Sequence, residues 1–77
     1  MTVTVHSKPA CQQCTATIRK LTKEGIAHTV VQLTDESVAA FKDAGHMQAP
    51  IVVAGDLVFS GFRPDLINQH FPKENAA

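Results

Sequence analysis

Two cysteines, Cys11 and Cys14, stand three positions apart and are the only thiols in this sequence of 77 residues. A pair at this spacing can be a structural disulfide, part of a metal site, or a reversible redox couple. A structural crosslink here closes a very short loop, where it restricts the unfolded chain least. The redox and metal interpretations therefore need the closer examination.

Cys11 follows an alternating, β-branched run at residues 2–6 and precedes a helical apolar pattern at residues 12–24. We therefore expect Cys11 in the first turn of a helix, where unpaired amide N–H groups and the helix dipole lower the pKa of a thiol. Lys8 adds to that effect from nearby in the sequence. Cys14 comes almost one turn later on the same face and closer to the body of the protein. Cys11 can then attack a substrate disulfide, and Cys14 can resolve the mixed disulfide that forms.

A metal site remains the alternative use of the two thiols. A closed zinc site needs four ligands, and the sequence has no second Cys-x-x-Cys motif and no paired histidines. The four histidines, His6, His28, His46 and His70, are scattered along the chain, and no two of them share a predicted element. Small copper chaperones also carry Cys-x-x-Cys at the start of a helix, but they have a β-α-β-β-α-β order and usually a Met where this chain has Pro9. The redox interpretation is favoured over a metal-binding or metal-delivery module.

Composition narrows the function further. Hydrophobic residues make up 44% and charged residues 18% of the chain, which is typical of a globular protein, and its length predicts one domain over residues 1–77. Seven basic and seven acidic side chains give a net charge of zero without long blocks of one sign, so we expect neither nucleic-acid nor membrane binding.

No apolar run approaches the roughly 18 residues of a spanning helix, and no leader pattern precedes the first strand. We expect a cytoplasmic protein, where a cysteine pair is more often catalytic or metal-binding than structural.

The remaining pattern predicts the order β-α-β-α-β-β-α in one α/β domain. Strands are expected at residues 2–6, 27–33, 51–54 and 57–60, and helices at 12–24, 35–44 and 64–71. Gly25 and Gly45 stand where helix C-caps are expected, and Thr34 is an N-cap candidate. The second helix has an amphipathic pattern in Val38, Ala39, Phe41 and Ala44. The elements predict a four-stranded mixed sheet with three helices packed on it, followed by a frayed tail at residues 73–77.

Three motifs together resemble the NrdH-redoxins, which are glutaredoxin-sized members of the thioredoxin fold. They are residues 8–14 (KPACQQC), residues 48–50 (QAP) and residues 60–65 (SGFRPD), and the resemblance extends from about residue 3 to residue 71. It implies a thiol-disulfide oxidoreductase that donates electrons to the large subunit of a class Ib ribonucleotide reductase. It also implies recharging by thioredoxin reductase, with no bound cofactor and a redox-active Cys11–Cys14 disulfide.

The resemblance also assigns roles to residues outside the cysteine pair. It implies a cis peptide bond between Ala49 and Pro50, which presents backbone groups to an extended substrate segment. Further expected partner contacts are Lys8, Gln13 and Phe62, and the expected loop-bracing residues are Ser60, Gly61, Arg63 and Asp65. The residues alone leave alternatives open, because Pro50 can also be a trans residue that begins an edge strand. Likewise, Phe62 can be a core residue and the Arg63 and Asp65 charges a solvated helix start.

Some positions depart from the family pattern. Gln12 stands between the cysteines where an apolar residue is expected, Phe59 stands where Trp is common, and His6 stands where Tyr is common. A protonated His6 near Cys11 raises the thiolate fraction, whereas a strand-end histidine is more often a plain surface residue. A single Gly61 followed by Phe62 replaces the paired glycines of glutathione-dependent glutaredoxins, which remain a further alternative. We therefore expect poor glutathione binding.

Overall fold

The computed structural model describes residues 2–71, so the frayed tail expected at residues 73–77 lies outside the described residues. The element order is β-α-β-α-β-β-α, as predicted. The bounds are β1 Val3–Ser7, α1 Gln12–Lys23, β2 Thr29–Gln32, α2 Asp35–Asp43, β3 Ile51–Ala54, β4 Leu57–Ser60 and α3 Pro64–His70. The β3–β4 hairpin has the predicted bounds, and β2 is shorter than expected at both ends.

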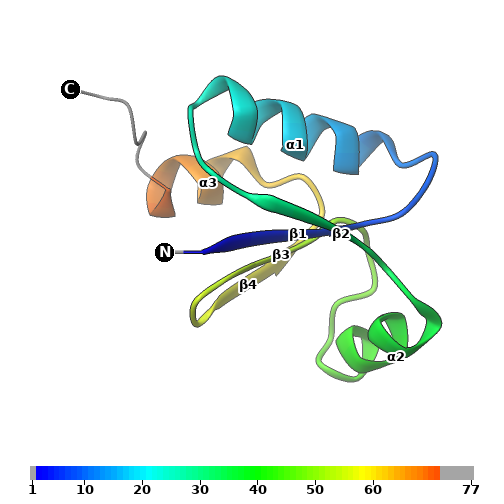
Figure 1. The fold of residues 1–77 in the computed structure, drawn as a ribbon. Coiled ribbons are helices and arrows are strands. Elements are labelled where there is room, and N and C mark those ends of the chain that lie inside the picture. Colours follow the sequence, from blue (N-terminus) through cyan, green and yellow to red (C-terminus); the bar gives the residue numbers. More distant parts are fainter. Residues whose placement is uncertain (1, 72–77) are drawn as a thin grey trace.

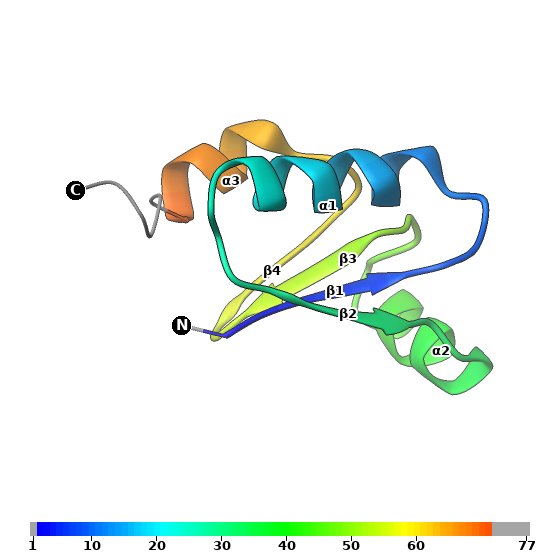
Figure 2. The same cartoon turned by 45° about the horizontal axis from the view of Figure 1, so that its top comes forward.

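The four strands form one mixed sheet in the order β2-β1-β3-β4 (Figure 1). Strand β1 pairs with β2 in parallel and with β3 antiparallel, and β4 runs antiparallel to β3. Helices α1 and α3 cover one face, while α2 lies on the other side, at one end of the sheet (Figures 1 and 2). This arrangement is the expected thioredoxin-like fold.

The core lies between the sheet and the pair α1 and α3. Val5 on β1 lies directly opposite Val52 on β3, and Val52 lies directly opposite Phe59 on β4. The three side chains therefore point to the same face of the sheet. Leu21 from α1 and Ile67 from α3 close over them, and both are fully buried. Burying one such aliphatic side chain stabilises the fold by about 1.5–3 kcal/mol. The core therefore fixes α1, and with it the cysteine pair, against the end of β1.

The packing predicted for α2 was wrong. No residue of this helix is buried, and Val38 is 47% exposed. Only the Phe41 ring makes an aromatic contact, with its centroid 4.9 Å from that of His6. A capping box begins the helix, because the Thr34 side chain accepts a hydrogen bond from the Ser37 N–H and the Ser37 hydroxyl accepts one from the Thr34 N–H. An apolar period in a sequence indicates a helix face but not whether another element covers it.

Both predicted C-cap glycines have the expected left-handed backbone. Gly25 follows α1 with φ 72°, and Gly45 follows α2 with φ 93°. Glycine adopts these angles without the steric cost that a Cβ atom brings.

Within residues 2–71, no helix is both long enough and apolar enough to cross a membrane.

Candidate redox site

Cys11 is the N-cap residue of α1 rather than a residue of its first turn. Its backbone is extended, with φ −114° and ψ 107°, and its Sγ accepts a hydrogen bond from the Cys14 N–H at 3.1 Å. The sulfur thus takes the place of the oxygen that usually caps a helix. The preceding Ala10 has φ 54°, a left-handed conformation that is uncommon for a residue other than glycine. Amide N–H groups at the helix start favour negative charge on the Cys11 sulfur once the pair is reduced.

The two cysteines form a disulfide with their Cα atoms 5.2 Å apart. Cys11 is half-buried, whereas Cys14 is only 3% exposed. The predicted difference in exposure is therefore confirmed. An incoming disulfide can approach the Cys11 sulfur, while Cys14 stays behind it on the core side of the helix.

The segment before β3, which contains Ala49 and Pro50, lies beside the Cys11 sulfur. The Ala49–Pro50 peptide bond is cis, as the resemblance implied. The Ala49 carbonyl oxygen lies 3.8 Å from Cys11 Sγ, and the Pro50 side chain is fully buried. The Pro50 carbonyl oxygen accepts a hydrogen bond from the Gly61 N–H at 2.8 Å. The proline segment and the loop after β4 are thus held together beside the disulfide.

Gln13 connects the start of α1 to the loop after β4. Its Oε1 accepts a hydrogen bond from the Phe62 N–H at 3.0 Å. Gly61 is buried with φ 79°, and a Cβ atom there would lie 3.0 Å from Gln48 Oε1 and 3.1 Å from Gln13 Oε1. Gly61 therefore permits both the backbone conformation and the close approach of two glutamine side chains. Phe62 is 36% exposed, so it is not a core residue.

Gln48 and His46 are two residues near the site that the sequence analysis does not assign to it. Gln48 had no role beyond its place in a motif, and His46 was treated only as one of four scattered histidines. In the structure His46 Nδ1 lies 3.3 Å from the hydroxyl of Ser60, so it ties the end of β4 to the segment before Pro50. No periodic pattern marks such residues, because they sit in loops that only the tertiary fold brings together.

Arg63 and Asp65 form an exposed ion pair at the start of α3. The guanidinium donates two hydrogen bonds, Nε to Oδ1 at 3.2 Å and Nη2 to Oδ2 at 3.0 Å. This hydrogen bonding raises the pKa of Arg63 and lowers the pKa of Asp65. The two side chains are 50% and 63% exposed, so solvent screens the pair. The pair joins two residues of one turn.

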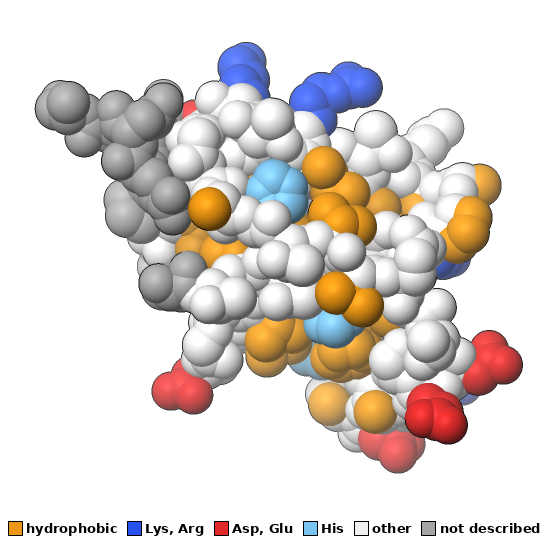
Figure 3. Space-filling view, viewed as in Figure 1, with side chains coloured by type: hydrophobic (Ala, Val, Ile, Leu, Met, Phe, Trp, Pro, Cys, Tyr) orange, Lys and Arg blue, Asp and Glu red, His pale blue; other side chains and the backbone are white. Residues whose placement is uncertain are grey.

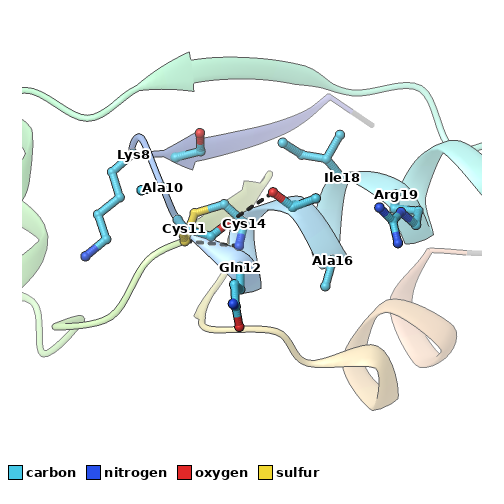
Figure 4. A pocket seen from close by; sticks show the side chains of 10 residues that line it. Lys8, Ala10, Cys11, Gln12, Cys14, Ala16, Ile18 and Arg19 are labelled. Atoms are coloured by element: carbon cyan, nitrogen blue, oxygen red, sulfur yellow. Dashed lines mark hydrogen bonds between the residues drawn. A yellow bond between two sulfur atoms is a disulfide. The ribbon is translucent and has the colours of Figure 1, made fainter.

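The structure brings Lys8 and Gln12 to the disulfide but not His6. Two open depressions adjoin Cys11 and share Lys8, Ala10 and Gln12 in their linings. One, of about 540 Å³, follows the side of α1, and Figure 4 shows the disulfide within it. The other, of about 400 Å³, extends toward Met47, Gln48 and Ala49. His6 lines neither depression; its ring packs against Phe41 of α2 instead.

The site therefore has one accessible sulfur, one protected sulfur and open surface on both sides of the pair. This geometry suits thiol-disulfide exchange, in which a second thiol waits behind the first. Among residues 2–71, no group of three or more His, Cys, Asp or Glu side chains is arranged to hold a metal ion.

Comparison with known proteins identifies the family to which this chain belongs. Residues 3–59 match the sequence model of the glutaredoxin family. The glutaredoxin-like protein NrdH of Escherichia coli K12 is 38% identical over 79 aligned residues, which cover 100% of this chain and 98% of the relative. The chain belongs to the NrdH-redoxins of the glutaredoxin family. NrdH of Lactococcus lactis MG1363 is 36% identical over 64 residues, or 80% of this chain and 89% of that one.

Solved structures agree with this assignment. The NrdH-redoxin of E. coli superposes with a TM-score of 0.86 at 38% identity, over 94% of this chain and 97% of the other. A glutaredoxin of Archaeoglobus fulgidus, at 21% identity, shares the fold with a TM-score of 0.69 over 87% of this chain and 82% of the other. As an NrdH-redoxin, the chain is a member of a thiol-disulfide oxidoreductase family and carries the cysteine pair on which that chemistry depends.

Replacing Gln13 with Met should release the Phe62 segment from α1. Met has a similar length but no strong acceptor for the Phe62 N–H, so the free energy of unfolding should fall by about 0.5–1 kcal/mol. We expect the KM for a protein disulfide to rise more than the KM for a small disulfide, because a protein is large enough to reach both Cys11 and the exposed Phe62 ring. Gln69→Met is the matched control, because Gln69 is exposed on α3 and lines neither depression beside Cys11. Gln13→Glu, which keeps an acceptor oxygen, should restore the KM; equal KM values in all three variants would contradict a positioning role.

Proposed function

We propose that this protein is a dithiol electron carrier that reduces the disulfide in the large subunit of a class Ib ribonucleotide reductase and is recharged by thioredoxin reductase. The observation that carries the proposal is the accessible Cys11 beside the buried Cys14, in a chain that NrdH of E. coli matches along its whole length. The cytoplasm is the proposed compartment, because its reducing pool keeps such a pair available as a dithiol.

The proposed reaction moves two electrons from the cysteine pair to the substrate. The Cys11 thiolate attacks one sulfur of the substrate disulfide, the substrate S–S bond breaks, and the second substrate sulfur leaves as a thiolate that takes a proton from water. Cys14 then loses its proton and attacks Cys11 Sγ. The mixed disulfide breaks, the Cys11–Cys14 disulfide forms, and the first substrate sulfur leaves as a thiolate.

The residues of this chain have separate parts in that sequence. The start of α1 stabilises negative charge on Cys11 through the Cys14 N–H. The cis Ala49–Pro50 segment offers backbone groups beside Cys11 for an extended substrate strand, and the exposed Phe62 ring offers apolar contact. Burial keeps Cys14 from competing for the incoming disulfide.

The loop after β4 favours a protein reductant over glutathione. A glutathione carboxylate is best held by a cation or by helix-start amides. In this loop the Arg63 guanidinium is already paired with Asp65, and Phe62 follows the single Gly61. The E. coli NrdH-redoxin, which shares 38% identity, is described as having a thioredoxin-like activity profile. Both observations support thioredoxin reductase as the electron source.

The electron source can be tested with two reducing systems at matched ionic strength. NADPH with thioredoxin reductase should reduce the Cys11–Cys14 disulfide and support insulin reduction. Reduction by glutathione with glutathione reductase should be slower by about tenfold or more. A glutathione carboxylate that finds no cation in this loop loses about 1.5–3 kcal/mol of binding free energy. Equal or faster turnover on glutathione would place the protein with the glutathione-dependent glutaredoxins.

The acceptor needs a second assay. In the presence of NADPH, thioredoxin reductase and this protein, a class Ib ribonucleotide reductase should form deoxyribonucleotide through many turnovers, and it should stop near one turnover when this protein is omitted. Failure to sustain turnover with a reduced and competent carrier would remove ribonucleotide reductase from the proposal while leaving disulfide reduction intact.

A further inference from the structure

Although the net charge is zero, basic and acidic side chains are concentrated on different helices. Helix α1 carries three basic side chains and no acidic one: Arg19, Lys20 and Lys23. Helix α2 carries three acidic side chains against one basic: Asp35, Glu36 and Asp43 against Lys42. Figure 3 shows Lys and Arg side chains projecting above α1, and Asp and Glu side chains gathered around α2 at the opposite side of the molecule.

In the part of the chain that the structure describes, only one of the basic side chains on α1 forms an ion pair. Lys20 pairs with Glu24 at 3.3 Å, one turn further along the chain. Among the described residues, no ion pair involves Lys8, Arg19 or Lys23. All three side chains are exposed, so their charges remain available to a binding partner.

These cations border a surface that begins at the disulfide. The depression of about 540 Å³ beside Cys11 runs from Lys8 at one end to Arg19 at the other, as Figure 4 shows. A second open depression adjoins it, sharing Thr15, Ile18 and Arg19 and continuing to Lys23. Neither lining contains an acidic side chain. We call this surface, from Lys8 and Cys11 to Lys23, the α1 groove.

We propose that the α1 groove docks an acidic segment of the protein substrate, which carries the disulfide that Cys11 attacks. This inference rests on the proposed function and adds a substrate class to it. The apolar part of the groove, with Ile18 half-buried at its centre, suits the stems of extended side chains. The cations at its ends suit carboxylates, and complementary charge speeds association and orients the partner.

Helix geometry sets the spacing of that segment. Arg19 is eight residues from Cys11, or about 12 Å along a helix, and Lys23 is about 18 Å away. An extended chain advances about 3.3 Å per residue, so these distances correspond to about four and five residues. The substrate carboxylates should therefore lie four and five positions from the cysteine that bonds to Cys11.

The test uses peptides whose single cysteine is linked to thionitrobenzoate as a mixed disulfide. One pair of peptides carries either Asp or Asn at the fourth and fifth positions after the cysteine, and a second pair carries them before it. The reduced protein is mixed with each peptide at low and high salt, and release of thionitrobenzoate is followed. In each reaction one peptide disulfide is reduced to two thiols while Cys11 and Cys14 are oxidised to their disulfide.

We expect the Asp form of one pair to react about 3- to 10-fold faster than its Asn form at low salt, and this preference should shrink at high salt. The double variant Arg19→Gln/Lys23→Gln should lose the preference while reacting with the Asn peptide at the wild-type rate. Lys20→Gln is the matched control, since Lys20 lies on the same helix outside the groove and should keep the preference.

Three results would overturn the proposal: no preference in the wild type, a preference that survives the double variant, or an equal loss in Lys20→Gln. The Asn peptides separate this failure from failure of the proposed function. If they are reduced without any charge preference, the carrier function stands and the docking proposal fails. If no peptide is reduced, the dithiol function fails and the docking proposal fails with it.

Discussion

Replacing Cys11 with Ser is expected to reduce disulfide turnover by a factor on the order of 10³ or more, because the variant lacks the thiolate that attacks the substrate. Cys14→Ser should behave differently. Its Cys11 can still attack, but no second thiol releases the mixed disulfide, so a covalent complex with the substrate should accumulate. Mass spectrometry without reductant should detect this complex in Cys14→Ser and not in Cys11→Ser.

The control for both variants is Gln12→Ser, which places a serine between the cysteines and leaves both thiols intact. It should keep turnover within a few-fold of the wild type, since Gln12 is exposed and takes no part in the exchange. If instead Cys11→Ser forms the covalent complex while Cys14→Ser does not, the roles of the two cysteines are reversed. The difference in burial between the sulfurs would then be no guide to reactivity.

Replacing Leu21 with Ala should give the largest loss of stability at a position outside the site. Leu21 is fully buried where α1 crosses the sheet, so removing its branched end leaves a cavity as well as losing transfer free energy. The expected decrease in the free energy of unfolding is about 2–5 kcal/mol. Because small domains have little stability in reserve, the urea midpoint of the oxidised protein should fall sharply.

Val31→Ala is the comparison for that experiment. Val31 lies on β2 with 41% of its surface exposed, and its truncation should cost less than about 1 kcal/mol. The m-value should stay the same in both variants, since the surface exposed on unfolding hardly changes. Equal losses at Leu21 and Val31 would show that the core does not lie between α1 and the sheet.

Much of this fold follows from local signals in the sequence. The hairpin bounds at Ile51–Ala54 and Leu57–Ser60 were predicted because the turn residues Gly55 and Asp56 separate two short apolar runs. Gly25 marked the end of α1 because a left-handed residue ends a helix. The packing of α2 was not predictable in the same way. Its apolar period is real, but the contacts of a helix depend on where its connections place it.

In the candidate site, too, local features were predicted from the sequence and tertiary contacts were not. Cys11 and Cys14 were found from residue type and spacing, and their order of exposure from the helix start. The cis bond before Pro50 came only from the family resemblance, since local sequence also allows a trans strand residue. The contacts of Gln13 and Gln48 with the loop at Gly61 escaped prediction, because they join segments nearly fifty and thirteen residues apart.

The unburied α2 divides the molecule into parts of unequal local stability. A helix without buried side chains loses little apolar contact when it opens, so we expect its amide hydrogens to exchange with solvent through local opening rather than through global unfolding. The amides of β1 and β3, the central strands of the sheet, should exchange only when the whole domain unfolds. After α2 ends at Asp43, the chain continues through residues 44–46 into residues 47–49, which line the depression beside Cys11. One wall of the redox site is therefore attached to the least cooperative part of the fold, while the sulfurs are attached to the most cooperative part.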